Sequence, residues 1–241
     1  MSRLKVAEVL RDNYDDYYGG EDSEYLETWR RLGALDKAEN IVALWGDRPI
    51  RSVVEIGAGN GAILERLEEL DFAQELSALE ISASGVEVIK NRGIERLVDC
   101  QQFDGYHVPY EDDTFDLAVM SHVIEHVEYP RMLLYEAKRI AKYVFVEVPL
   151  EDNLRLPLDF VLDKVGHINF YSPRTIRRLI QSCDLEIVAQ AMTNPSKDVY
   201  LFHDGERGVP KYYIKEALMK LAPRLASSLF VYHACILSKS A

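Results

Sequence analysis

The chain has 241 residues, of which 48% are hydrophobic, and a formal net charge of −12 at pH 7. The length and apolar fraction fit one large domain with a sizeable core. The excess of acidic residues argues against electrostatic binding to nucleic acid or to an anionic membrane surface, so we expect neither as a partner.

The first part of the chain is predicted to be helical, because Trp29, Leu32, Leu35 and Ile41 are spaced to pack on one side. Strand-like and helix-like runs then alternate, which predicts a doubly wound α/β fold. The expected strands are Ser52–Ile56, Glu75–Ile81, Arg96–Phe103, Phe115–His122, Tyr143–Val148, Leu185–Met192 and Phe230–Ser238. The expected helices are Ala62–Leu70, Ser82–Asn91, Pro130–Ile140 and Pro173–Ser182.

We interpret the chain as a single domain made of four segments. These are a helical cap at 1–48, a core at 49–192, an insertion at 193–229 and the last strand at 230–241. The basic residues of the insertion are expected on a solvated helix face rather than on a binding surface. They are Lys211, Lys215, Lys220 and Arg224.

The most informative segment runs from Val53 to Ile63 and reads VVEIGAGNGAI. An apolar strand leads into three glycines at alternate positions, Gly57, Gly59 and Gly61, and a helix-like run follows. Glycine has no Cβ and tolerates a positive φ, so such a turn lets backbone approach a ligand closely. The turn therefore predicts a nucleotide-type site at the carboxyl end of a parallel strand.

Two acidic residues accompany this turn. Glu55 places a carboxylate on an otherwise apolar strand. Glu80 ends the next strand about 20 residues beyond the glycines, where an acidic residue usually binds ribose hydroxyls. The segment from Gly57 to Ala62 also fits the dinucleotide pattern, with alanine in the last place. An NAD(P)-dependent oxidoreductase is therefore an alternative, although we find no second half-site for a nicotinamide.

Several motifs resemble one enzyme family. Glu55–Gly61, an acidic residue followed by Gly-x-Gly-x-Gly, resembles the first motif of class I S-adenosylmethionine (SAM)-dependent methyltransferases. Val108–Leu117 resembles the LPF-x-D-x-x-FD segment of that family. Met120–Val127 and Gly166–Ser172 are similar to the x-H-V-x-E-H-V and G-H-x-x-x-[FY]-[ST] runs of its type-11 and type-23 small-molecule members.

This resemblance implies a Rossmann-like, seven-stranded, mostly parallel sheet with an antiparallel last strand, and SAM as the cofactor. Asp104 is then expected to accept a hydrogen bond from the adenine, although it also suits a turn before Gly105. Tyr18 is expected in an aromatic lid over SAM, with simple packing as the alternative. The full set of expected cofactor-binding residues is Glu55, Gly57, Ala58, Gly59, Gly61, Glu80, Ile81, Asp104, Gly105, Ser121 and Tyr18.

The resemblance also implies methyl transfer to a small-molecule acceptor by in-line displacement, with oxygen expected as the acceptor atom. Positioning alone can lower the barrier by ~7–11 kcal/mol, and a hydroxyl acceptor further needs a base, for which histidine is suited. We expect His167 in this role, and otherwise His122. For His167 the alternative is a loop histidine that caps the next helix. A methyltransferase-like subunit without catalysis is the third function considered.

His122, Glu125 and His126 also match the H-x-x-E-H pattern of some zinc hydrolases. A zinc site needs these residues on one helix face and a third ligand, whereas this run directly follows an apolar strand. We therefore expect no metal and a hydrogen-bonding role for His126 in the pocket wall. Glu147 is expected to be hydrogen-bonded or to face the site, because an unpaired buried carboxylate is costly.

The cysteines Cys100, Cys183 and Cys235 are far apart and odd in number, which indicates a reducing compartment without a disulfide framework. The first residues contain no signal-peptide core, and no apolar run reaches membrane-spanning length. We expect a cytoplasmic protein with no membrane partner. The sequence leaves a homodimer open.

Overall fold

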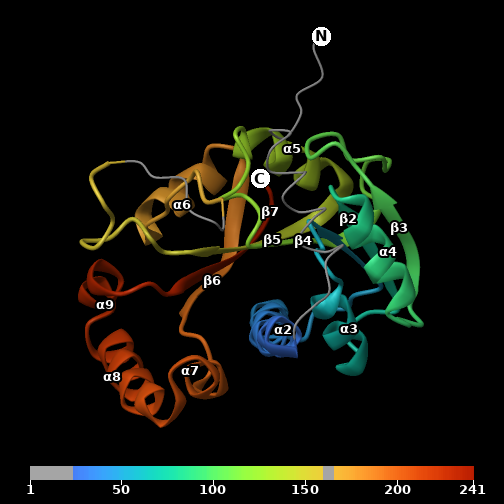
Figure 1. The fold of residues 1–241 in the computed structure, drawn as a ribbon. Coiled ribbons are helices and arrows are strands. Elements are labelled where there is room, and N and C mark those ends of the chain that lie inside the picture. The colour runs from blue at the N-terminus through green and yellow to red at the C-terminus, as the bar shows by residue number, and fades with distance from the viewer. Residues whose placement is uncertain (1–23, 160–165) are drawn as a thin grey trace.

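A computed structural model describes residues 24–159 and 166–241, and within them a seven-stranded sheet forms the centre of the molecule (Figure 1). The strands are β1 (Ser52–Ile56), β2 (Glu75–Glu80), β3 (Leu97–Gln102), β4 (Phe115–Ser121), β5 (Ala141–Pro149), β6 (Leu185–Thr193) and β7 (His233–Ser240). Their order is β3-β2-β1-β4-β5-β7-β6. β7 pairs antiparallel with both β5 and β6, whereas the other pairings in this sheet are parallel. The predicted fold class is therefore confirmed.

Helices cover both faces of the sheet (Figure 1). On one face lie α2 (Glu24–Trp45), α3 (Ala62–Glu69) and α4 (Ala83–Asn91), and on the other lie α5 (Pro130–Ile140) and α6 (Pro173–Gln181). A hydrophobic core lies on each face of the sheet, and successive residues of β1 point into one or the other. Val53 packs toward α2 and α3, and Val54 packs toward α5. A parallel strand that is buried on both faces becomes continuously apolar, which explains the runs seen in the sequence.

The last strand begins later than predicted. We expected it at Phe230, but α9 (Pro223–Leu229) ends only at Leu229, and a short connection separates it from β7, which starts at His233. The N–H of Phe230 still donates to the carbonyl of Ala226. The other predicted strands and helices agree with the structure to within two residues at each end.

The first described helix packs through a stripe that shares only Ile41 with the predicted one. Its buried residues are Ala34, Ala38, Ile41 and Trp45, which recur at helical spacing and face β1 and α3. Trp29 was expected in this stripe, but it is 40% exposed. Its ring lies 6.3 Å from that of His203 on α7 (Lys197–Asp204), so it faces the insertion instead of the sheet.

The insertion between β6 and β7 is helical and lies beside α2 (Figure 1). It contains α7, the short η1 (Gly205–Arg207), α8 (Gly208–Leu221) and α9. The expectation of a solvated basic face is wrong for Lys215, which is buried. Its Nζ donates to the carbonyl of Val231 at 2.8 Å and lies 4.7 Å from the ring centre of Tyr232. This carbonyl and the aromatic rings compensate for burying the ammonium group.

None of the helices in the described ranges is long and apolar enough to cross a membrane.

Candidate active site

The turn between β1 and α3 has a backbone that only glycine adopts easily. The φ angles are 77° at Gly57, 59° at Gly59 and 77° at Gly61, all in the left-handed region. A Cβ atom on Gly57 would lie 2.7 Å from Cγ2 of Val123. The turn is therefore packed directly against the segment that follows β4, and a side chain at Gly57 has no space.

The amides of this turn are held by the end of β2. The N–H groups of Gly57 and Ala58 both donate to the carbonyl of Leu79, at 2.7 and 3.0 Å. The N–H of Gly59 donates to Oε2 of Glu80 at 2.8 Å. These bonds fix the turn at the carboxyl edge of the sheet, where doubly wound folds bind their ligands.

The carboxylate of Glu80 is buried and has several donors. Its Oε1 accepts the N–H groups of Ile81 at 2.9 Å and Ser82 at 3.1 Å, in addition to the bond between Oε2 and Gly59. Ser82 in turn caps α4 by accepting the N–H of Gly85 at 2.9 Å. One side chain thus joins the glycine turn to the amino end of α4.

The second acidic residue of the turn region is in a very different environment. Glu55 is 2% exposed, and its Oε2 has no hydrogen-bond partner among the described residues. Burial raises the pKa of Glu55 to about 8, although the positive charge of Lys37 opposes the shift. The side chain is therefore predominantly protonated at neutral pH.

Asp104 and Gly105 form the turn after β3. Oδ1 of Asp104 accepts the N–H groups of Tyr106 at 3.0 Å and His107 at 2.7 Å. Burial opposes ionisation, but these bonds outweigh it and lower the pKa of Asp104. Gly105 has a φ of 91°. The turn role that we considered for Asp104 is therefore present.

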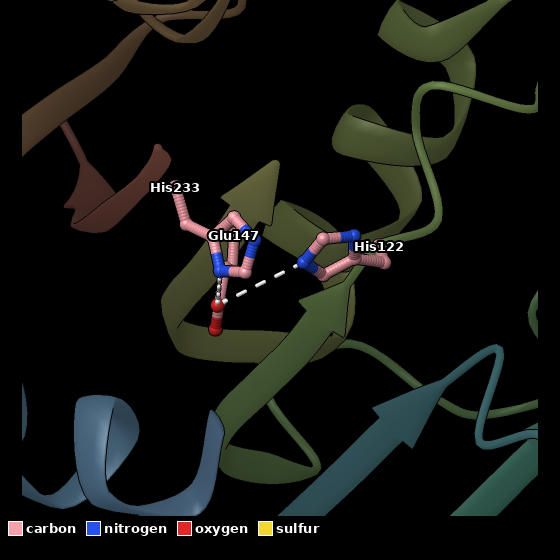
Figure 2. A group of neighbouring side chains, drawn as sticks. All are labelled: His122, Glu147 and His233. Atoms are coloured by element: carbon pink, nitrogen blue, oxygen red, sulfur yellow. Dashed lines mark hydrogen bonds and ion pairs between the residues drawn. The ribbon is translucent and has the colours of Figure 1, made fainter. Parts of the chain in front are cut away.

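A histidine–glutamate–histidine group lies where β4, β5 and β7 meet (Figure 2). Glu147 is fully buried, and its Oε1 accepts a hydrogen bond from Nδ1 of His233 at 3.1 Å. Nε2 of His122 lies 3.8 Å from the same oxygen. Ser121 donates its hydroxyl to Oε2, and Asn40 of α2 donates its amide to Oε1, each at 3.4 Å. The prediction that Glu147 is hydrogen-bonded is confirmed.

His122 has a strained backbone and two acidic neighbours. Its φ is 57°, which is uncommon outside glycine and asparagine and recurs at functional sites. Its Nδ1 lies 3.2 Å from Oε1 of Glu125. Burial and Lys37 both disfavour protonation, but the carboxylates of Glu125 and Glu147 outweigh them and raise the pKa of His122. Burial likewise opposes ionisation of Glu147, yet His122 and His233 lower its pKa.

A second group of titratable side chains follows directly. The ligand atoms of Glu125, His126 and His167 all lie within 4.8 Å of one another. Nδ1 of His126 donates to the carbonyl of Gly166 at 3.1 Å, and Nδ1 of His167 donates to Oε2 of Glu151 at 2.7 Å. The H-x-x-E-H residues are thus divided: His122 joins Glu147 and His233, whereas Glu125 and His126 join His167.

Sequence reasoning missed His233, Asn40 and Glu151. The signal for His233 was available: an antiparallel strand begins at the edge where its parallel neighbours end, so its first residue belongs to the site edge. In the register, Glu147 pairs with Cys235 and Pro149 pairs with His233. Tyr18, the expected lid residue, lies outside the described residues.

Comparisons with known proteins agree with this geometry. Residues 23–190 match a family model described as a methyltransferase domain. An uncharacterized methyltransferase of Exiguobacterium sibiricum is 31% identical over 124 residues, which is 52% of this chain and 53% of that protein. A ubiquinone/menaquinone biosynthesis C-methyltransferase of Bartonella quintana is 26% identical over 169 residues, 63% of this chain and 65% of that protein. Each match therefore spans less than two thirds of the relative's own length.

A solved structure shares the fold over almost its whole length. Geranyl diphosphate C-methyltransferase from Streptomyces coelicolor A3(2), in complex with Mg²⁺, geranyl diphosphate and S-adenosyl-L-homocysteine (SAH), aligns with a TM-score of 0.66 at 13% identity. The alignment covers 98% of this chain and 99% of that one. At this identity the likeness concerns the fold.

Proposed function

Because the chain belongs to the methyltransferase-domain family, we propose that it transfers the methyl group of SAM to an oxygen atom of a small molecule. The observation that carries the choice of an acceptor that must lose a proton is the position of His122. This residue directly follows β4, lies between the buried carboxylates of Glu125 and Glu147, and precedes Val123, which contacts the glycine turn. A base beside the methyl donor suits an acceptor that must lose a proton.

The residues of the turn region fit SAM, the cofactor of this family. Val123 fills the space that a Cβ on Gly57 would occupy, so this position carries no side chain. The turn therefore presents backbone atoms here to a ligand. The buried Oε2 of Glu55 has no partner within the described ranges, and a ligand with donor groups would supply one. We assign cofactor binding to the residues that the sequence predicted and the structure describes: Glu55, Gly57, Ala58, Gly59, Gly61, Glu80, Ile81, Asp104, Gly105 and Ser121.

In this mechanism the protein positions two reactants and removes a proton. When bound, SAM supplies a methyl group on a positively charged sulfonium, whose displacement leaves a neutral thioether. His122 accepts the hydroxyl proton of the acceptor as the new O–CH₃ bond forms, and the carboxylate of Glu147 stabilises the resulting imidazolium. The leaving group is neutral, so no oxyanion hole is required, and alignment supplies most of the acceleration.

Carbon is the second candidate acceptor atom. It is favoured by the names of two similar proteins, since both the Bartonella quintana relative and the Streptomyces coelicolor structure are C-methyltransferases. An acidic carbon also loses a proton to a base, so His122 fits either reaction. The position of the methyl group in the product, determined by NMR with a labelled methyl donor, separates the two.

The proposal is tested in two steps. Calorimetry with SAM and SAH tests cofactor binding, and absence of binding by either compound would overturn the proposal. A panel of phenols, sugars and quinone precursors is then assayed for release of SAH. With a substrate in hand, His122→Asn is expected to reduce kcat by about 10²–10⁴-fold while the affinity for SAH stays unchanged. His203→Asn is the control, since His203 lies on α7 and contacts Tyr25.

A further inference from the structure

We propose that Glu125, His126 and His167 form a binding site for one divalent first-row transition-metal ion. Their ligand atoms lie within 4.8 Å of one another, so an ion needs only small side-chain movements to reach all three. Two imidazole nitrogens and one carboxylate oxygen are a donor set used for Zn²⁺ and for other ions of this series. The site goes beyond the proposed function, because binding of the ion does not depend on which acceptor is methylated.

The carboxylate of Glu125 is the first observation that indicates a ligand. Glu125 is fully buried, and neither Oε1 nor Oε2 has a hydrogen-bond partner among the described residues. Nδ1 of His122 lies 3.2 Å from Oε1 as an ion-pair neighbour, but not in hydrogen-bonding geometry. One such neighbour offsets only part of the cost of burying a carboxylate that receives no hydrogen bond, and coordination of a cation supplies the missing partner.

The orientation of the two histidines is the second observation. A carbonyl or a carboxylate can only accept, so Nδ1 of His126 carries the proton that Gly166 accepts, and Nδ1 of His167 carries the proton that Glu151 accepts. In a neutral ring this places the lone pair on Nε2. Metal-binding histidines show this same arrangement, in which the other ring N–H is held by a carbonyl or a carboxylate.

The two loops that supply the ligands are fastened together by their backbones. The N–H groups of Ile168 and Asn169 both donate to the carbonyl of Glu125 at 2.9 Å. The side-chain amide of Asn169 donates to the carbonyls of Ile124 and Val127, at 3.1 and 2.7 Å. The segment after β4 and the segment before α6 therefore present their ligands from one connected structure.

The neighbouring group of His122, Glu147 and His233 does not need an ion. Glu147 already accepts hydrogen bonds from His233, Asn40 and Ser121, as Figure 2 shows for His233. From the sequence we expected no metal, because the H-x-x-E-H run directly follows an apolar strand instead of lying on one helix face. In the structure His167, from the segment before α6, takes the place of His122 in this set of ligands.

The test measures metal binding directly. The 241-residue chain is dialysed against a chelator at neutral pH. It is then titrated with Zn²⁺ by calorimetry and with Mn²⁺ by electron paramagnetic resonance, with Mg²⁺ as the comparison ion. We expect saturable one-to-one binding of Zn²⁺ and Mn²⁺ at micromolar concentration and much weaker binding of Mg²⁺, because two of the ligands are imidazoles.

Variants identify the ligands. Glu125→Gln and His167→Asn are each expected to weaken Mn²⁺ binding by at least about 10–100-fold, whereas His233→Asn, which alters the neighbouring group, leaves it unchanged. If circular dichroism shows that Glu125→Gln does not fold, the Mn²⁺ affinity of His167→Asn alone tests the assignment of the ligands. The proposal is overturned if the wild-type protein binds neither Zn²⁺ nor Mn²⁺, or if His233→Asn loses binding while His167→Asn retains it.

Discussion

Glu80 Oε2 accepts a hydrogen bond of 2.8 Å from the N–H of Gly59, so a single carboxylate connects the end of β2 to the turn after β1. Its other oxygen accepts the N–H groups of Ile81 and Ser82 at the start of α4. A buried carboxylate with three backbone donors is firmly oriented. The two segments that border the proposed cofactor site therefore keep a fixed relation to each other.

Replacing Glu80 by glutamine is expected to weaken SAH binding by about 10–100-fold, because the amide has one acceptor oxygen and no charge. Calorimetry with SAH measures the effect. Glu75→Gln is the matched control on the same strand, since Glu75 forms a surface ion pair with Arg51 at 2.8 Å. Equal SAH affinities for wild type and Glu80→Gln would contradict the assignment of Glu80.

Gly57→Ala is expected to lower the free energy of unfolding by about 1–3 kcal/mol, since the new Cβ meets Val123 and the backbone is in the left-handed region. Gly33→Ala in α2 provides the opposite case. A Cβ there meets nothing within 4 Å, so the helix should gain about 0.5–1 kcal/mol. Urea unfolding compares the two, and destabilisation of similar size in both variants would refute the steric argument.

The buried carboxyl of Glu55 predicts a dependence of stability on pH. Burial raises its pKa from 4.5 to about 8, so between these values the folded state binds more protons than the unfolded state. The free energy of unfolding should therefore fall as the pH rises through this range, by up to a few kcal/mol at about 1.4 kcal/mol per pKa unit. Glu55→Gln cannot titrate, so its stability should decrease less with pH. Denaturant unfolding measures the free energy of unfolding of both proteins as a function of pH. If it falls equally with pH in wild type and Glu55→Gln, Glu55 does not have this environment.

Arg139 of α5 holds the loop that contains Asp104. It donates to the carbonyls of Val108 and Tyr110, at 3.0 and 2.7 Å, and to the carboxylates of Asp112 and Glu136. Lysine cannot span these acceptors from one nitrogen, so Arg139→Lys is expected to cost about 1–3 kcal/mol and to lower the Tm.

The matched control for this substitution is Arg131→Lys on the same helix. Arg131 makes one side-chain hydrogen bond in the described ranges, to Ser182 at 2.9 Å, so little change is expected. Differential scanning calorimetry measures the Tm of both variants. A Tm for Arg139→Lys as high as that of Arg131→Lys would show that the loop is held by other contacts.

The glycine turn and the alternation of strands and helices were predictable because they depend on consecutive residues. The sequence displays two local requirements directly: a positive φ at Gly57 and Gly61, and a strand that is apolar on both faces. These requirements do not distinguish a SAM site from a dinucleotide site, because both use such a turn. The ordered motifs that follow, up to His122 and Glu125, favoured the methyltransferase family.

Tertiary structure alone decided which titratable groups meet. His233 reaches Glu147 because β7 returns antiparallel beside β5, and His167 reaches Glu125 because the segments after β4 and before α6 are joined by hydrogen bonds. Both pairings depend on strand order and register, which no local pattern encodes. Lys215 shows the same limit: its basic side chain indicates a solvated face, and only the packing of α8 against Tyr232 and Val231 buries it.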